Sequence, residues 1–120
     1  MCGFTGFLTP TSFDQKSALQ ILKKMTGSLN HRGPDEEGFW LNEKDILAFG
    51  HRRLSILDLS SAGSQPMTSR CGRYVIVYNG EVYNHNILRS EISQSTSISW
   101  QGTSDTETLV EAMSILGIEN

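Results

Sequence analysis

The sequence has little that would hold it together covalently or anchor it in a membrane. Only 2 of its 120 residues are cysteine, too few for the disulfide framework of small secreted proteins. Its apolar runs are short, such as residues 74–78, and none approaches the roughly 20 apolar residues that span a bilayer. The amino end shows neither the basic nor the long apolar segment of a secretory signal peptide. We therefore expect a cytoplasmic protein with free thiols.

An excess of positive charge is also missing. With 10 basic and 13 acidic side chains the net charge is -3, so no bulk positive field draws the chain to nucleic acid or to an anionic membrane. No cysteine and histidine spacing resembles a metal site, and no ATP-binding loop is found. What remains is an ordinary globular balance, 38% hydrophobic and 19% charged residues, in a length that suits one domain.

Hydrophobic periodicity predicts both helices and strands. Helices are expected over 15–30, with Asp14 as its cap, and over 84–95 and 104–116, the last with an apolar face of Leu109, Ala112, Met113 and Leu116. Strands are expected at 2–8, 37–41, 46–52 and 73–78 (the last buried on both faces), loops at 31–35 and 60–72, and a strand or ordered turn at 53–59. Hairpin-joined strands with separate helices predict an α+β fold in which helices cover antiparallel sheet.

Cys2 follows the initiator methionine, and its small side chain favours removal of Met1. It would then carry a thiol and a free α-amine, whose pKa of about 8 leaves part of it neutral near pH 7. The amine could take the thiol proton, so that one residue supplies nucleophile and base. Gly3 beside it would let a substrate approach closely. From position alone, an ordinary residue near a frayed terminus is the better interpretation.

Asn79-Gly80 comes directly after the strand expected at 73–78. The pair is a strong signal for a hairpin turn, which explains it without any function. A tight turn would also present the Asn79 amide and the Gly80 N–H as two donors, and acyl transfer needs two donors aimed at the developing oxyanion. The structural and the functional interpretations are compatible.

Two further segments would suit the two ends of an α-amino acid. His51-Arg52-Arg53-Leu54-Ser55 is either a solvated basic pair at a strand end or offers one arginine for a bidentate grip on a carboxylate. Thr103-Ser104-Asp105-Thr106-Glu107 has the spacing of a helix capping box between Ser104 and Glu107. In the functional interpretation, Asp105 instead pairs with a substrate ammonium group.

Five segments, in order, resemble the N-terminal glutaminase domain of class II glutamine amidotransferases, most closely the glutamine-hydrolysing asparagine synthetase branch. They are Met1-Cys2-Gly3, His31-Arg32-Gly33-Pro34-Asp35, Arg53-Leu54-Ser55-Ile56-Leu57-Asp58, Asn79-Gly80-Glu81-Val82-Tyr83-Asn84 and Ser104-Asp105-Thr106-Glu107. The branch is indicated by Pro34-Asp35 and by Arg53-Leu54, where the fructose-6-phosphate and phosphoribosyl relatives carry Arg-Trp or Arg-Tyr. Relatives that make β-lactams lack the cysteine that this chain has.

The resemblance implies an N-terminal-nucleophile hydrolase fold, an αββα sandwich with antiparallel sheets. Because family glutaminase domains are longer, residues 1–120 would be the N-terminal part of a truncated domain, with the synthetase domain absent from this chain. Cys2 would be the nucleophile, and Asn79 and Gly80 would form the oxyanion hole. The remaining substrate contacts fall on Arg53 for the glutamine carboxylate, on Leu54, Ser55, Ile56 and Leu57 for the pocket, and on Glu81 and Asp105 for the α-amino group.

The implied reaction hydrolyses L-glutamine to glutamate and ammonia through a Cys2 thioester. The ammonia would pass to a C-terminal synthetase domain, which would use ATP and Mg²⁺ to amidate aspartate, while this domain needs no cofactor and no metal. A homodimer is a candidate assembly that the family suggests. Two alternatives stay open: an amidotransferase with another acceptor, such as a sugar or cell-envelope precursor, and a non-catalytic glutamine-binding fragment.

The other reactive side chains have simpler interpretations. Three histidines would permit a Cys–His dyad like that of papain-type enzymes, but an amine base makes a histidine base unnecessary. Cys71, in a Ser/Gly-rich loop, is interpreted as an incidental free thiol. The expected supporting roles are loop organisation by His31, a place near a helix start for His85, structural support by Arg32 and Asp35, and a solvated position for Arg52.

Overall fold

The computed structural model describes residues 2–11, 14–42, 47–55 and 60–118. They divide into two compact units, and each unit is described by itself. The first unit contains Met1–Ser55, Ser64–Pro66 and Val77–Asn79, and the second contains Ile56–Gly63, Met67–Ile76 and Gly80–Asn120.

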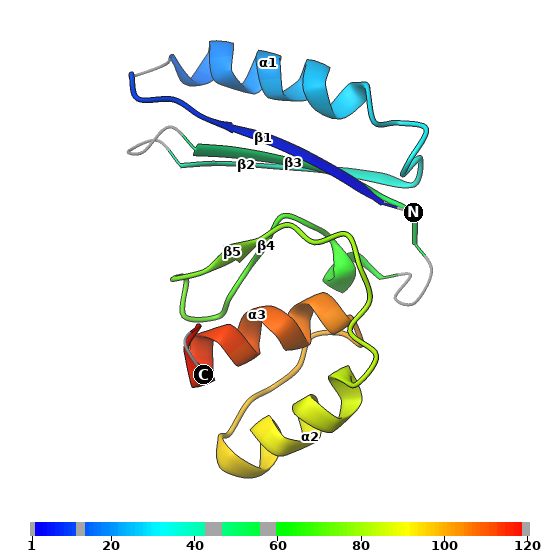
Figure 1. The fold of residues 1–120 in the computed structure, drawn as a ribbon, viewed down its shortest axis with the longest axis vertical. Coiled ribbons are helices and arrows are strands. Elements are labelled where there is room, and N and C mark those ends of the chain that lie inside the picture. The colour runs from blue at the N-terminus through cyan, green and yellow to red at the C-terminus, as the bar shows by residue number, and fades with distance from the viewer. Residues whose placement is uncertain (1, 12–13, 43–46, 56–59, 119–120) are drawn as a thin grey trace. The chain divides into compact units, whose positions relative to one another are not determined.

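A three-stranded antiparallel sheet forms the body of the first unit (Figure 1). Strands β1 (Gly3–Leu8) and β2 (Glu36–Asn42) both pair with the central strand β3 (Leu47–Arg53). In this register Phe4 and Gly38 flank His51. The three strands predicted here are confirmed with ends shifted by one residue, and the connection at 43–46 lies outside the described residues.

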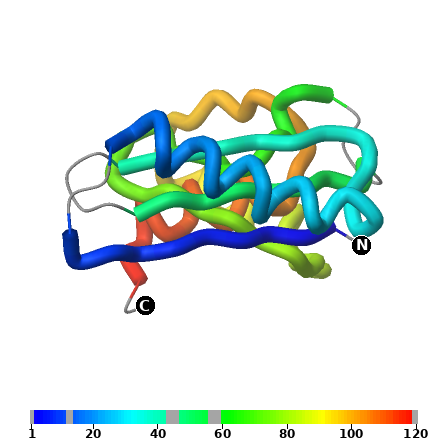
Figure 2. Tube along the Cα trace, turned by 90° about the horizontal axis from the view of Figure 1, so that it is seen from above, coloured from blue at the N-terminus to red at the C-terminus, as the bar shows by residue number. Residues whose placement is uncertain are grey.

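Helix α1 (Gln15–Gly27) runs along one face of this sheet (Figures 1 and 2). The predicted cap is confirmed, because the Asp14 carboxylate accepts the Ser17 N–H at 3.1 Å. Ala18, Leu22 and Thr26 form its buried stripe at a spacing of four residues. The helix ends three residues before the predicted position 30, because residues 28–32 continue as turns bonded back to 24–29.

The second unit holds a small sheet and two helices (Figure 1). Strands β4 (Met67–Thr68) and β5 (Val75–Ile76) pair antiparallel, and helix α3 (Asp105–Leu116) packs against both this sheet and helix α2 (His85–Ser95). The short 3₁₀ turn η1 (Ser61–Gly63) interrupts the predicted loop. The prediction of a doubly buried strand over 73–78 was wrong, because only Val75 and Ile76 pair and both are half-buried.

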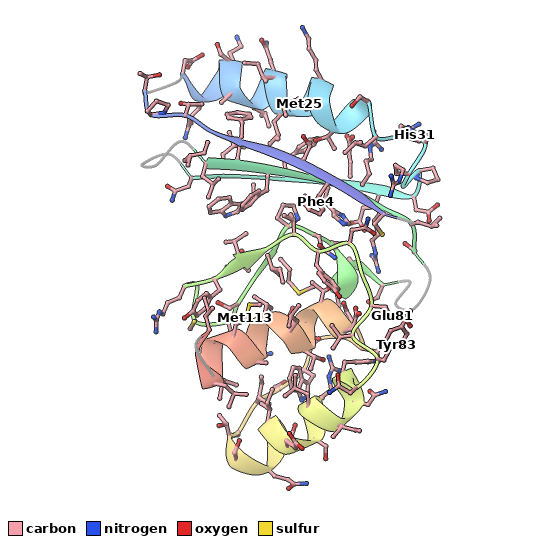
Figure 3. The ribbon with its side chains drawn as sticks, viewed as in Figure 1. Phe4, Met25, His31, Glu81, Tyr83 and Met113 are labelled. Atoms are coloured by element: carbon pink, nitrogen blue, oxygen red, sulfur yellow. The ribbon has the colours of Figure 1, made fainter. Side chains whose placement is uncertain are left out.

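Helix α3 is buried around most of its first two turns, whereas a single apolar stripe was predicted. Ala112 is buried as expected, but Leu116 is 44% exposed, while Glu107 and Glu111 are only 6% and 4% exposed. The sequence pattern missed the burial of Glu111 because its partner is a distant main-chain group, the Arg70 N–H, which donates to Glu111 Oε1 at 2.8 Å. Met113 is labelled on this helix in Figure 3. No helix within the described ranges has the length and apolar character needed to cross a bilayer.

Candidate active site

Cys2 stands one residue before β1, next to the end of β3. Its sulfur accepts the main-chain N–H of Leu54 at 3.3 Å, and the thiol lies 3.6 Å from the Leu54 carbonyl oxygen. The residue is half-buried. Because Gly3 pairs with Arg52 in the antiparallel β1–β3 register, Cys2 lies at the end of β3, where the N–H of the next residue, Leu54, reaches its sulfur. The sheet therefore holds the half-buried Cys2 sulfur against an N–H donor. A hydrogen bond from this donor is stronger to a thiolate than to a neutral thiol.

Arg53, the last residue of β3, is 7% exposed and held by an acid that the sequence pattern did not single out. Its Nη1 donates to Glu36 Oε2 at 2.9 Å, and Ser64 Oγ donates to Glu36 Oε1 at 2.5 Å. Burial raises the pKa of Glu36, but the bonds from Ser64 and Arg53 and the charges of Arg53 and His51 outweigh burial, so this pKa is lowered. Glu36 is therefore an anion that orients the Arg53 guanidinium.

The loop at 31–35, in which Figure 3 labels His31, is joined to the residues at and beyond the end of β3. The Asp35 N–H donates to the Arg53 carbonyl at 3.1 Å, and the Asp35 carboxylate accepts the Ser55 N–H at 2.8 Å. A Cβ at Gly33 would overlap the main chain of Arg52 and Arg53, so the loop reaches the strand only because this residue has no side chain. The structural support predicted for Asp35 is thus present.

The neighbouring Arg52 was predicted to be solvated, and this prediction was wrong. Arg52 Nη2 forms an ion pair with Glu37 Oε2 at 2.9 Å, and its side chain is 15% exposed. The two residues are direct partners in the β2–β3 register, where opposite charges stabilise each other. Successive side chains of a strand point to opposite faces, so Arg52 and Arg53 belong to different faces of the sheet.

His51 is 1% exposed and hydrogen-bonds through its ring to the Tyr78 backbone. Burial lowers the pKa of His51 to about 4, although the bond to Tyr78 acts in the opposite direction. The ring is therefore neutral at pH 7. The Tyr78 N–H donates to Gln65 Oε1 at 2.6 Å. Asn79 comes next, is exposed, and belongs to the same unit as Cys2.

The second unit contains the other predicted substrate contacts. Asp105 opens α3 and is 8% exposed, and its Oδ2 accepts the Val82 N–H at 2.9 Å. Gly80 and Glu81 precede Val82 and are exposed, and Figure 3 shows Glu81 and Tyr83 on the segment that leads into α2. Asp105 therefore ties this segment to the start of α3, a contact that sequence spacing could not reveal.

An arginine on α2 fixes the segment that enters α3. Arg89 donates to the carbonyl oxygens of Gly102 at 2.6 Å and Ser104 at 3.1 Å, and its Nη2 lies 3.2 Å from Glu107 Oε2. The Glu107 carboxylate also accepts the N–H groups of Gln101 and Gly102 at 2.7 and 3.0 Å. The predicted cap is confirmed for Ser104, whose Oγ accepts the Thr106 N–H at 3.2 Å. These bonds hold Asp105 at the first position of the helix.

The structure thus groups the predicted residues by unit. Cys71 is an exposed free thiol, as predicted, and hydrogen bonds with Ser114 and Ser69 lower its pKa. In the described part of the chain, no three His, Cys, Asp or Glu side chains gather into a metal-binding group. The first unit contains Cys2, Arg53, Leu54, Ser55 and Asn79, the second contains Gly80, Glu81 and Asp105, and Ile56 and Leu57 lie outside the described residues.

The sequence is similar to known proteins over most of its length. Residues 1–120 match the family model described as a glutamine amidotransferase domain. The chain is 40% identical over 118 residues to asparagine synthetase [glutamine-hydrolyzing] 3 of Bacillus subtilis (strain 168), a match that covers 93% of this chain and 18% of that protein. It is 40% identical over 95 residues to asparagine synthetase B [glutamine-hydrolyzing] of Escherichia coli (strain K12), covering 76% and 16%. Amidase chry2 of Gibberella zeae is 32% identical over 118 residues, covering 92% and 17%. The chain spans less than a fifth of the length of these relatives.

Proposed function

Because the chain belongs to the glutamine amidotransferase domain family, we propose that it hydrolyses L-glutamine to glutamate and ammonia with Cys2 as the nucleophile. One observation carries the proposal. The half-buried Cys2 sulfur is fixed against the Leu54 N–H, beside the end of β3, whose last residue is the buried cation Arg53. A nucleophile and a carboxylate-binding group on adjacent strand ends are what an amino-acid amide requires.

The reaction proceeds in two acyl-transfer steps. Once Met1 is removed, the α-amine of Cys2 takes the thiol proton and the sulfur attacks the side-chain amide carbon of glutamine. The C–S bond forms, the C–N bond breaks, and the protonated amine returns its proton to the departing ammonia. Water then attacks the thioester carbon, with the same amine as base. The C–O bond forms, the C–S bond breaks, the amine returns the proton to the sulfur, and glutamate leaves. The oxyanion of each step accepts hydrogen bonds from the Asn79 side-chain amide and the Gly80 N–H.

The substrate is recognised at its two charged ends. Arg53 binds the α-carboxylate of glutamine, and Glu36 supports it by holding Nη1 in one orientation. Asp105 and Glu81 bind the α-ammonium group, as the resemblance implies. The same resemblance assigns the rest of the pocket to Leu54, Ser55, Ile56 and Leu57.

The domain is proposed to take the N-terminal-nucleophile hydrolase fold and to act within a longer protein. Relatives at 40% identity are named as glutamine-hydrolysing asparagine synthetases, and this chain covers 18% and 16% of their length. On this basis the ammonia is delivered to a synthetase domain that uses ATP and Mg²⁺ to convert aspartate to asparagine. The proposed mechanism gives none of the residues discussed above a role in binding ATP or Mg²⁺.

The direct test is release of ammonia and glutamate from glutamine by the purified protein and by its Cys2→Ala variant. The variant is expected to lose turnover, whereas Cys71→Ala, which removes the other thiol, is expected to keep it. Equal turnover with and without the Cys2 thiol would refute the proposal. Calorimetric titration tests the alternative of a non-catalytic glutamine-binding fragment, because glutamine binding without ammonia release would indicate such a module.

A further inference from the structure

The main chain at Tyr78 is held on both sides by side chains from distant parts of the first unit. Its N–H donates to Gln65 Oε1 at 2.6 Å, and its backbone also bonds to the His51 ring. That second bond stabilises the protonated ring, so the ring N–H donates and the Tyr78 carbonyl accepts it. Both main-chain hydrogen-bonding groups of Tyr78, which lie in the peptide units before and after its Cα, are therefore fixed by buried side chains, since His51 is 1% and Gln65 is 9% exposed.

A glycine in β2, paired with His51, lets the segment that carries Gln65 pack against the sheet. Gly38 is the direct partner of His51 in the β2–β3 register. A Cβ at Gly38 would overlap the Gln65 carbonyl and lie 3.2 Å from Pro66 Cδ, so the Gln65–Pro66 segment packs where a side chain would otherwise stand. The central strand of the sheet thus supplies His51, and the missing side chain at Gly38 leaves room for the segment that carries Gln65.

We infer that His51 and Gln65 are positioning residues, which fix the main chain on both sides of Tyr78 and thereby set where the side-chain amide of the next residue, Asn79, points. The inference rests on the proposed function, in which Asn79 is an oxyanion donor. Such a donor must lie about 2.7–3.1 Å from the oxyanion, and losing one costs about 100- to 1,000-fold in turnover. Neither residue touches the substrate. His51 serves as a neutral, buried donor, which gives this histidine a role other than base.

The inference predicts a loss in kcat with little change in KM when the Gln65 acceptor is removed. Gln65→Met keeps the length of the side chain without its oxygen and is expected to lower kcat about 10- to 100-fold, with KM within about twofold because Arg53 and Asp105 are untouched. Gln65→Glu restores an oxygen acceptor and is expected to recover most of the loss. Gln20→Met, the same change at an exposed position of α1, is the matched control.

Turnover is counted per active site, by alkylating Cys2 with an electrophilic glutamine analogue, so that misfolded protein does not enter kcat. An unchanged kcat in Gln65→Met, or equal losses in Gln65→Met and Gln65→Glu, would overturn the inference. His51→Phe, which removes the ring donor and keeps a planar ring, is expected to act in the same direction as Gln65→Met.

Amide hydrogen exchange at Tyr78 separates this inference from the proposed function. The Tyr78 N–H is expected to exchange slowly in the wild type and at least tenfold faster in Gln65→Met. Equal exchange rates in the wild type and in Gln65→Met would overturn the proposed anchoring of Tyr78, even if the enzyme is active. If the wild type releases no ammonia, the proposed function fails and the catalytic purpose of the anchor fails with it, whatever the exchange rates are.

Discussion

The Leu54 N–H donates to the Cys2 sulfur at 3.3 Å, across a sequence separation of 52 residues. Leu54 is the first residue beyond β3, and β3 is paired with β1 along its length. The position of the candidate nucleophile is therefore set by the sheet, although the nucleophile lies next to the chain end, where fraying is the usual expectation.

Arg53 and Arg52 offer a matched pair for testing carboxylate binding. Arg53→Lys is expected to raise KM for glutamine at least tenfold, because an ammonium group cannot make the bidentate contact of a guanidinium. Arg52→Lys, on the other face and paired with Glu37, is expected to leave KM within about twofold. Steady-state kinetics on both variants checks this. A similar KM for the two would remove Arg53 from the substrate site.

Glu36 should act through Arg53. Glu36→Gln removes the charge that orients the guanidinium and leaves one oxygen acceptor in place of the two carboxylate oxygens to which Ser64 and Arg53 donate separately. We expect KM to rise by less than in Arg53→Lys, and we expect kcat to stay near the wild-type value. Glutamine titrations of Glu36→Gln, Arg53→Lys and the double variant measure the coupling. Fully additive effects would mean that Glu36 acts independently.

Stability should fall as the pH is lowered from about 6.5 to about 4. Folding depresses the His51 pKa from 6.5 to about 4, so in this window the unfolded chain binds a proton that the folded chain does not. The stabilisation is complete above the unfolded pKa and is lost as the pH approaches 4, by up to about 3 kcal/mol. Glu36, whose pKa is lowered, adds its own loss only below about 4.5.

Urea denaturation across this pH range measures the His51 effect. His51→Phe should flatten the dependence between pH 6.5 and 4, while His31→Gln, a change at an exposed histidine, should retain it. A slope that persists unchanged in His51→Phe would assign the effect to another group.

Two glycines should respond in opposite directions to the same substitution. Gly33→Ala places a methyl group inside the main chain of Arg52 and Arg53, and we expect it to lower the free energy of unfolding by about 2 kcal/mol or more. Gly27→Ala, at the last residue of α1 with nothing within 4 Å of the new atom, should be neutral or stabilise by about 0.5–1 kcal/mol. Chemical denaturation of both variants gives the comparison, and equal effects would contradict the close approach at Gly33.

Arg89 should matter for folding far more than an exposed arginine does. Arg89→Lys loses the forked set of donors to Gly102, Ser104 and Glu107, and we expect a loss of about 2–4 kcal/mol because Glu107 would be left buried with a poorer partner. Arg70→Lys changes only an exposed side chain and should cost less than about 0.5 kcal/mol. Thermal unfolding of the two variants measures both losses of stability, and equal losses would contradict the expected difference.

Local signals in the sequence predicted the local structure well. Asp14 marked the start of α1, the alternation around residues 36–53 marked the β2–β3 pair, and Ser104 marked the start of α3. Each of these features depends on residues close together in the chain. Cys2 and Arg53 were also identified from short motifs, although their roles stay predictions.

The errors occurred where distant groups decide the outcome. The apolar run at 74–78 satisfied a strand pattern, but its last residue gives its N–H to the Gln65 side chain instead of a neighbouring strand. Glu111 looks solvated in the sequence and is buried because the main-chain N–H of Arg70 reaches it. Glu107 was predicted in a capping box with Ser104, but its carboxylate accepts the N–H groups of Gln101 and Gly102. Glu36 escaped notice because its partner Arg53 is supplied by register, which no spacing within one segment encodes.

The exposed thiol of Cys71 has a practical bearing on any attempt to count working molecules. Hydrogen bonds with Ser114 and Ser69 lower its pKa, so a larger share of it is thiolate than in an ordinary surface cysteine. A general alkylating reagent will consume this sulfur alongside that of Cys2, and the label incorporated per chain will overstate the reactive population. Active sites are best counted in a Cys71→Ala background, where a single thiol, that of Cys2, remains to be titrated.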